Sequence, residues 1–283
     1  AGFLDELRAL LAAHPNVPRG YLELEVLESS ALEDIALVSA VIDASATLGV
    51  SFALDDFGTG YSSLTYLKRL PAQVLKIDQS FVRDMLQDSD DLAILEGILG
   101  LATAFRRRAI AEGVETVAHG ETLLRLGCDL GQGYGIARPM AAADLPAWRQ
   151  RWRPDPRWAH AHCLDRELMP VLIAGVEHRG WIVALGEHLD GRRDAPPPLD
   201  HHQCRFGQWL DKTIHQPRHA ATFATIETLH LRVHALAADL LKRRSQGHDV
   251  EALAGMAELH ALWDALLVHL EYLLKDDPRS LAP

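Results

Sequence analysis

Histidine is spread very unevenly along the chain, and this imbalance limits the folds that are open to it. Only His14 and His119 precede residue 154, whereas the other 13 of the 15 histidines follow it. Such an abrupt shift indicates a boundary between two domains with different chemistry, and 283 residues are enough for two. Trp148–Trp158 contains two prolines, four arginines and three tryptophans, which is typical of a final helix that runs into a linker. We therefore expect a first domain over 1–150, a linker over 151–162 and a second domain over 163–283.

Composition excludes several classes of protein. The net charge of −11 argues against a surface that binds DNA or RNA, which needs lysine and arginine to replace counterions. No apolar run approaches the roughly 18 residues that span a bilayer, so we expect no membrane segment. The three cysteines are too few and too scattered for a disulfide framework, which indicates a reducing cytoplasm. The first residues, AGFLDELRALL, lack the basic region of a signal peptide and read like the middle of a helix, so we expect the chain to begin within a longer protein.

Strand-like and helical patterns alternate through the first half of the chain. The expected strands are short and apolar: Tyr21–Glu28, Val50–Phe57, Val74–Asp78, Ala109–Val114 and Gly133–Ala137. The helical patterns lie between them: Ile35–Leu48, Ser63–Leu70, Asp91–Phe105 and Ala118–Leu126. Strands that alternate with helices of this length predict βαβ units and a parallel sheet, hence an α/β fold.

Acidic side chains gather where these expected strands end: Glu25, Glu28, Asp55, Asp56, Asp78, Glu112 and Glu115. In a (β/α) barrel this end carries the active site, and so many carboxylates cannot all stay charged there without cations. Hard divalent ions such as Mg²⁺ or Mn²⁺ take oxygen ligands, and the adjacent pair Asp55–Asp56 can bridge two of them. Lys76, at a neighbouring strand end, can orient water or neutralise developing charge. Taken singly, each acid could instead cap a helix, but the full set favours hydrolysis of a phosphodiester.

Five stretches of the first half resemble, in order, the motifs of the EAL-domain family. They are LELEVLESS, FALDDFGTGYSSLTYLKRLP, LKIDQSFV, AIAEGVET and CDLGQGYGIARPM. Members of that family are cyclic di-GMP phosphodiesterases, which open cyclic di-GMP to the linear dinucleotide pGpG with Mg²⁺ or Mn²⁺. The resemblance covers roughly residues 1–150 and implies a TIM-like (β/α) barrel that binds cyclic di-GMP.

The resemblance also implies a role for each residue of the motifs. Three carboxylates would be metal ligands, with Asp55 as the bridge: Glu25, Asp55 and Asp56. Three residues would serve the chemistry, with Lys76 contacting the water and Glu112 as the general base or its support: Lys76, Asp78 and Glu112. The substrate side, including an anchor at Glu28 for the loop after Asp56, would be formed by Glu28, Glu115 and Gln132.

The sequence departs from the family pattern at its start. The Glu-Ala-Leu strand that names the family and an Asn ligand on another early strand are both missing, so about three of the eight barrel strands are absent. We therefore expect the chain as given to be inactive by itself. Because every later catalytic position is intact, we favour a fragment of a longer phosphodiesterase, with sensory or GGDEF-type domains possible upstream. The alternative is a catalytically inactive barrel that binds cyclic di-GMP or a partner.

After the linker the pattern is helical only. Apolar residues recur at helical spacing in three long segments and one short segment: Asp165–Leu189, Phe206–Ile214, His219–Lys242 and Val250–Leu274. The proline run of RRDAPPPL, Arg192–Leu199, separates the first two, and Pro217 ends the short one. Four amphipathic helices of this kind predict an all-α four-helix bundle.

Three histidines and one cysteine stand in spaced motifs on these helices. H-x-x-W begins at His178, C-x-F-G-x-W begins at Cys204, and H-x-x-x-H runs from His230 to His234. The three histidines fall on apolar stripes and would point into the bundle, where they and the cysteine suit a tetrahedral Zn²⁺. A single histidine on an apolar face is more often a hydrogen-bonded core residue, but three with a cysteine favour zinc. Other pairs compete: His215 and His219, His160 and His162 with Cys163, and His201 and His202.

The same motifs, in this order and spacing, resemble the chemoreceptor zinc-binding (CZB) family. The resemblance covers roughly residues 160–280 and implies four ligands for Zn²⁺: His178, Cys204, His230 and His234. Members are cytoplasmic four-helix bundles on bacterial signalling proteins, which respond to zinc and in some cases to oxidants through the cysteine. We therefore expect a signalling protein, with a homodimer as its assembly, in which a zinc-sensing domain regulates a phosphodiesterase.

Overall fold

The computed structural model describes residues 2–60, 64–165, 167–213 and 220–275. It divides into two compact units: residues up to 85 together with 90–163, and residues 86–89 together with those from 164 onward. The first unit is a parallel sheet with helices and the second is wholly helical, so the predicted fold class is confirmed. None of the described helices is both long and apolar enough to cross a membrane.

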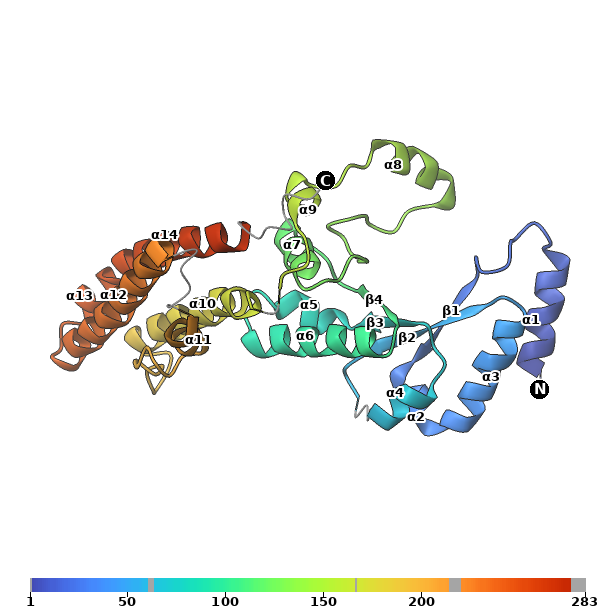
Figure 1. The fold of residues 1–283 in the computed structure, drawn as a ribbon, viewed down its shortest axis with the longest axis horizontal. Helices are drawn as coiled ribbons and strands as arrows, with labels where there is room; N and C mark the ends of the chain where they lie inside the picture. Colours follow the sequence, from blue (N-terminus) through green and yellow to red (C-terminus); the bar gives the residue numbers. More distant parts are fainter. Residues whose placement is uncertain (1, 61–63, 166, 214–219, 276–283) are drawn as a thin grey trace. The chain divides into compact units, whose positions relative to one another are not determined.

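Four parallel strands form the sheet of the first unit. They are β1 (Glu23–Leu27), β2 (Ser51–Phe57), β3 (Val74–Ile77) and β4 (Arg108–Ala111), and they lie side by side in chain order (Figure 1). All four residues of β3 are buried, as expected for a central strand of a sheet covered on both faces. The register pairs Leu27 with Asp55 and Ile77 with Ala111, so the strands reach their carboxyl ends at one edge.

One helix precedes the first strand and helices follow each of the four strands. They are α1 (Gly2–Ala13), α2 (Glu28–Glu33), α3 (Ile35–Thr47), α4 (Leu64–Arg69), α5 (Gln79–Asp84), α6 (Ser89–Ala104) and α7 (Val117–Arg125). Side-chain oxygens of Asp34, Asp78 and Thr116 accept hydrogen bonds from the first turns of α3, α5 and α7. The predicted start of one helix, Ser63, lies outside the described residues.

The fifth predicted strand, Gly133–Ala137, is wrong. Only Gly131 bridges to Ala111, and the following residues form a turn that lies against residues 111–115. The glycines explain the difference: a Cβ on Gly133 would lie 2.3 Å from the backbone nitrogen of Val114, and one on Gly135 would lie 2.8 Å from the carbonyl carbon of Glu115. The glycines that alternate with larger residues in Gly133–Ala137 thus allow this segment to pack closely against the backbone of residues 111–115, and they do not form a strand of the sheet.

Helices lie before and within the predicted linker, 151–162. η1 (Ala142–Asp144), α8 (Leu145–Arg151) and α9 (Pro156–His160) follow one another. Trp158 of α9 donates its indole N–H to the carbonyl of Val117 at 2.7 Å, and a Cβ on Gly120 would lie 2.5 Å from its ring. This part of the chain is therefore fixed to α7 and does not act as a free tether.

The second unit consists of α10 (Met169–Leu189), α11 (Arg205–Thr213), α12 (Ala220–Ser245), α13 (Asp249–Ala254) and α14 (Met256–Lys275), drawn from yellow to red in Figure 1. α12 packs chiefly against α14, and α10 contacts all four others. The predicted helix Val250–Leu274 is broken at Gly255, where a Cβ would lie 2.3 Å from Leu240. The predicted ends near Ile214, Pro217 and His219 lie outside the described residues.

Candidate metal centres

Charged side chains from three strands meet toward their carboxyl ends. They are Glu25 on β1, Asp55 on β2, Lys76 on β3 and Glu112, which follows β4. Lys76 Nζ lies 2.9 Å from Glu25 Oε1, 2.8 Å from Asp55 Oδ1 and 2.7 Å from Glu112 Oε1. A single ammonium group therefore joins carboxylates that are far apart in sequence.

Lys76 is a fixed positive charge in this cluster, because only 5% of the residue is exposed. Burial by itself would lower the pKa of the ammonium group, but the hydrogen bonds with Asp55, Glu112 and Glu25 raise it above its ordinary value. The lysine thus stays charged at neutral pH. Its three partners supply the compensation that a buried charge requires.

Asp56 adds another carboxylate beside Asp55. Its φ of +54° lies in the left-handed region, and the ladder to β3 changes register here, so β2 is irregular where the two aspartates lie. Oxygens of Asp55, Asp56 and Glu112 lie within 4.8 Å of one another. Burial, followed by the charges of Asp55 and Asp78, raises the pKa of Asp56. This concentration of carboxylates fits a hard divalent cation, whose charge would relieve their repulsion.

Glu28 lies at the start of α2 and is 1% exposed. Its Oε2 accepts a hydrogen bond from the backbone N–H of Gly58 at 2.9 Å. Burial raises the pKa of this carboxyl group, while the amides of Gly58 and Gly60 oppose the rise. The side chain thus contacts the loop that follows Asp56. The resemblance to the EAL family implies an anchor for this loop at the same residue.

The remaining predicted residues surround this cluster. Asp78 accepts from Ser80 N at 2.9 Å as the cap of α5, and its charge acts on Asp56. Glu115 and Gln132 line, with Glu112, a cavity of about 440 Å³. Every predicted carboxylate and Lys76 is therefore in or beside one region, although Glu25 contacts Lys76 and is not in the group of three acids that could share an ion.

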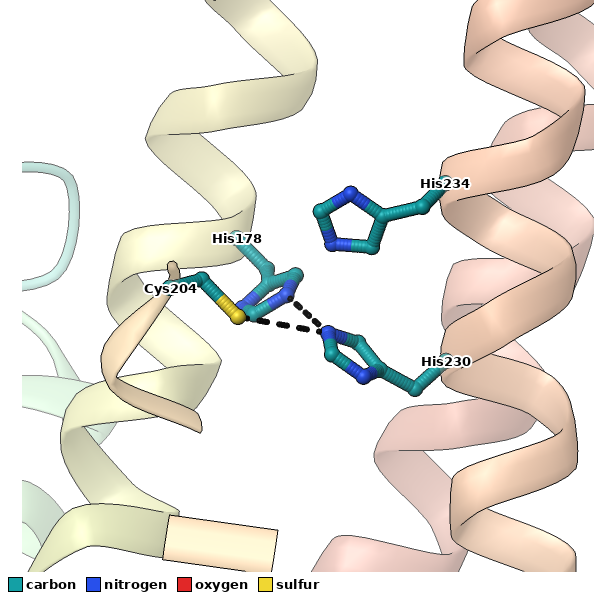
Figure 2. Close-up of side chains that lie close together, drawn as sticks. All are labelled: His178, Cys204, His230 and His234. Atoms are coloured by element: carbon teal, nitrogen blue, oxygen red, sulfur yellow. Dashed lines mark hydrogen bonds between the residues drawn. The ribbon is translucent and has the colours of Figure 1, made fainter. Parts of the chain in front are cut away.

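The second unit brings three of its histidines and one cysteine together from three elements. His178 lies on α10, Cys204 directly precedes α11, and His230 and His234 lie one turn apart on α12 (Figure 2). His230 Nε2 lies 3.2 Å from His178 Nε2 and 3.4 Å from Cys204 Sγ. One ligand atom from each of the four residues lies within 4.8 Å of the others.

Backbone carbonyls fix which nitrogen of two histidines faces the cluster. His178 Nδ1 lies 3.1 Å from the Ala174 carbonyl, and His234 Nδ1 lies 2.9 Å from the Leu199 carbonyl. Because a carbonyl only accepts, each Nδ1 carries the proton and each Nε2 keeps a lone pair. His234 Nε2 is buried and has no hydrogen-bond partner, which is the arrangement that a metal ion would satisfy.

The histidines are held neutral, as metal ligands must be. Burial, and then the charges of neighbouring histidines, lower the pKa of His178 to about 4 and that of His230 to about 2. Burial also lowers the pKa of His234. With Cys204 they form the nitrogen and sulfur donor set that suits tetrahedral Zn²⁺.

Cys204 owes its position to the glycine in C-x-F-G. The N–H of Gly207 donates to Cys204 Sγ at 3.1 Å, and a Cβ on Gly207 would lie 1.8 Å from the carbonyl oxygen of His201. Burial raises the pKa of the thiol, and the N–H groups of Gly207 and Phe206 oppose this. These donors can stabilise the thiolate that a metal requires.

The competing histidines are in neither group within the described residues. His202 is exposed and pairs with Asp211 Oδ2 at 3.0 Å. His162 lies 3.3 Å from the carbonyl of His160, in the first unit. His215 and His219 lie outside the described residues.

Comparison with known proteins agrees with both resemblances. Residues 1–139 match the EAL domain and residues 178–241 match the chemoreceptor zinc-binding domain. The solved EAL domain of Mycobacterium smegmatis DcpA is 38% identical, with a TM-score of 0.50 over 54% of this chain and 68% of that one. The chain belongs to the EAL-domain family. The predicted resemblances to the EAL and CZB families are thus confirmed.

Two curated relatives of the EAL domain come from Pseudomonas aeruginosa. The bifunctional diguanylate cyclase/cyclic di-GMP phosphodiesterase MucR is 46% identical over 147 residues, which are 52% of this chain and 21% of MucR. The cyclic di-GMP phosphodiesterase PA2567 is 39% identical over 151 residues, 53% of this chain and 26% of that protein. The chain therefore spans a minor part of the length of either relative.

Sequence reasoning missed two contributors to the CZB site. The ring of Trp263 on α14 stacks on His178, with centroids 5.2 Å apart and planes 8° apart. Its place on the apolar stripe of the last helix was the available signal. Nothing in the sequence singles out the Leu199 carbonyl, because every residue has a backbone carbonyl.

Proposed function

We propose that this chain is part of a phosphodiesterase that hydrolyses cyclic di-GMP to pGpG by two-metal catalysis. The convergence of Asp55, Asp56 and Glu112 beside Lys76, in an EAL domain, is the observation that carries the proposal. The names of the curated relatives support the same substrate.

The residues have separate tasks in this proposal. Asp55, Asp56 and Glu112 would hold Mg²⁺ or Mn²⁺, with Glu25 near them as a further ligand. The bound ions would supply a nucleophilic water at neutral pH and offset charge on the leaving oxygen. Lys76 keeps its charge and orients the water, because its three ion pairs fix the ammonium group in place.

Residues around the ions would position the substrate. Glu28 holds the loop after Asp56 through Gly58, and Asp78 stays close to Asp56. Glu115 and Gln132 line the cavity next to Glu112, where a bound nucleotide could be placed. Restricting the substrate to one pose converts binding energy into rate.

The test is hydrolysis of cyclic di-GMP by the full-length protein with Mn²⁺, followed by chromatography of pGpG. Asp55→Asn should abolish turnover, because it removes a charge from the centre of the metal group. Asp43→Asn makes the same change on an exposed position of α3 and should keep wild-type turnover. Wild-type turnover in Asp55→Asn would overturn the assignment.

A second candidate function is a barrel that binds cyclic di-GMP without hydrolysing it. The three ion pairs of Lys76 are the observation on its side, because one ammonium group offsets part of the negative charge of Glu25, Asp55 and Glu112. Tight binding of cyclic di-GMP by the full-length protein, with no pGpG formed at any Mg²⁺ or Mn²⁺ concentration, would select this function.

We further propose that the CZB domain binds one Zn²⁺ through His178, Cys204, His230 and His234, and that zinc occupancy changes the phosphodiesterase rate. The neutral histidines and the partnerless Nε2 of His234 support zinc binding. A reducing cytoplasm would keep Cys204 available as a thiolate ligand. Hydrolysis that is the same in buffered zinc and in a strong chelator would exclude regulation.

A homodimer is part of the proposal. Val183, Val268 and Tyr272 are exposed apolar side chains of the helical unit that a second copy could cover. Light scattering of the purified protein should give twice the chain mass, and a monomeric mass at all concentrations would exclude this assembly.

A further inference from the structure

The loop between α10 and α11 is held at two adjacent peptides beside the CZB site. Trp181 donates its indole N–H to the carbonyl of Pro198 at 2.7 Å. The next carbonyl, that of Leu199, lies 2.9 Å from His234 Nδ1. A tryptophan on α10 and a histidine on α12 are thus connected through two consecutive backbone groups.

The proline run stiffens the chain that leads to the first of these two peptides. Pro196, Pro197 and Pro198 each have a φ that the ring restricts, and the residues before proline are restricted as well. Holding the carbonyl of Pro198 fixes the peptide between Pro198 and Leu199, and only the two backbone torsions of Leu199 separate this peptide from the Leu199 carbonyl. A flexible loop of the same length would let that carbonyl turn away.

The Leu199 carbonyl decides the state of His234. While it accepts a hydrogen bond, Nδ1 carries the proton and Nε2 offers its lone pair to the cluster. If the carbonyl moved, the neutral ring could instead carry its proton on Nε2 and would no longer be a ligand there. The buried Nε2 has no other partner to select between these tautomers.

We propose that Trp181 is a positioning residue for zinc: its indole N–H holds Pro198, so that the Leu199 carbonyl keeps His234 in the tautomer that binds the metal. This rests on the proposed zinc site. The tryptophan of H-x-x-W would thus support zinc coordination indirectly, because its indole nitrogen is a hydrogen-bond donor and cannot itself be a ligand.

The ring of Trp181 has a separate packing role that the test must exclude. It lies against His234, with ring centroids 4.9 Å apart and planes at 45°. Trp181→Phe keeps an aromatic ring but removes the N–H donor. Trp158→Phe is the matched control, because that indole also donates to a backbone carbonyl at 2.7 Å, in the other unit.

The first measurement is the affinity of the full chain for Zn²⁺ alone, by competition with a chromophoric chelator. Trp181→Phe should weaken binding on the order of 10-fold, which is the lower end for the loss of an outer-shell partner. Trp158→Phe should bind as the wild type does. If the wild type itself binds no zinc, the proposed zinc site is wrong. If the wild type and Trp181→Phe bind zinc with equal affinity, the zinc site stands and the positioning role is overturned.

The second measurement reads the tautomer directly. ¹⁵N chemical shifts of His234 in the zinc-free wild type should show a proton on Nδ1 only, whereas Trp181→Phe should show a mixture with Nε2–H. Weaker zinc binding with an unchanged tautomer would assign the effect to packing and overturn the proposal.

A second variant covers the case in which Trp181→Phe does not fold. Pro198→Gly leaves the tryptophan in place but frees the backbone torsions of residue 198, so that the carbonyl that Trp181 holds is no longer prepositioned. It should give the same mixed tautomer and the same direction of affinity change. A single Nδ1–H tautomer with wild-type affinity in this variant would also overturn the proposal.

Discussion

The absence of one methyl group allows Cys204 to reach the three histidines of the proposed zinc site. Gly207 lies so close to the His201 carbonyl that a Cβ would be 1.8 Å away. Gly207→Ala should therefore displace the start of α11, weaken zinc binding and cost about 1–3 kcal/mol, the usual range for overpacking. Thermal unfolding and zinc content of the purified protein are the measurements.

Gly97→Ala is the control for this substitution. Gly97 lies within α6 and nothing would contact its Cβ within 4 Å, so alanine should be neutral or stabilise by roughly 0.5–1 kcal/mol. Equal effects of the two substitutions would show that the close approach at Gly207 is not what matters.

A second residue-scale prediction concerns pH and Glu28. Its folded pKa is raised above the unfolded value by burial, so the folded state binds the proton more tightly. The stability from this group is fully present below the unfolded pKa and is lost as pH rises through the folded pKa. Wild type should therefore gain stability relative to Glu28→Gln as pH falls from 7 toward 4. Denaturant unfolding at several pH values measures the difference, and a difference that does not change with pH contradicts the burial argument.

Secondary-structure elements were predictable where side-chain pattern decides them. β1 to β4 carry apolar runs ended by acids, and the structure places all four in one sheet. Prediction failed where backbone contact decides: Gly133 and Gly135 pack against the chain near Val114, and Gly255 leaves room for Leu240. Hydrophobic periodicity cannot distinguish a glycine whose missing Cβ makes room for a neighbouring residue from a glycine that a strand or helix merely tolerates.

The helices of the second unit should depend on zinc as a group. The proposed ligands come from α10, the start of α11 and α12, so one ion would link three elements. His234→Ala should lower zinc content and the melting temperature together, because metal binding is linked to folding. His260→Ala is the control, since His260 is exposed on α14 and outside the cluster. Elemental analysis and thermal unfolding measure both, and equal losses in the two variants would contradict the ligand set.

For the molecule as a whole, the sequence motifs predicted which residues form the candidate sites. They did not predict which partners balance the charges of these residues or accept their hydrogen bonds. The motifs contain Lys76, yet its three simultaneous ion pairs appear only when β1, β2, β3 and the residue after β4 are brought together. The partner of His234 is a backbone carbonyl 35 positions away, which no side-chain pattern encodes. Long-range contacts of this kind depend on the packing of complete units.

The last prediction concerns the coupling of the two units, and the structure indicates where along the chain to test it. Trp158 fixes α9 to α7, which begins just after Glu112 and Glu115, so residues up to 160 belong to the first unit. If zinc acts through the chain that leads into α10, the sensitive segment lies after Cys163 and not at Pro154 or Pro156, since Pro156 is already the first residue of α9.

A Gly-Ser stretch inserted after Cys163 should therefore remove the zinc dependence of cyclic di-GMP hydrolysis in the full-length protein, because a flexible linker does not transmit a restraint. The same stretch inserted at Gly247, in the turn before α13 where nothing would contact a Cβ, should leave it intact. Rates are compared in buffered zinc and in chelator. Zinc dependence that survives the first insertion would show that this segment does not transmit the effect of zinc. The two conformations that zinc binds unequally would then be coupled to the phosphodiesterase through another part of the protein.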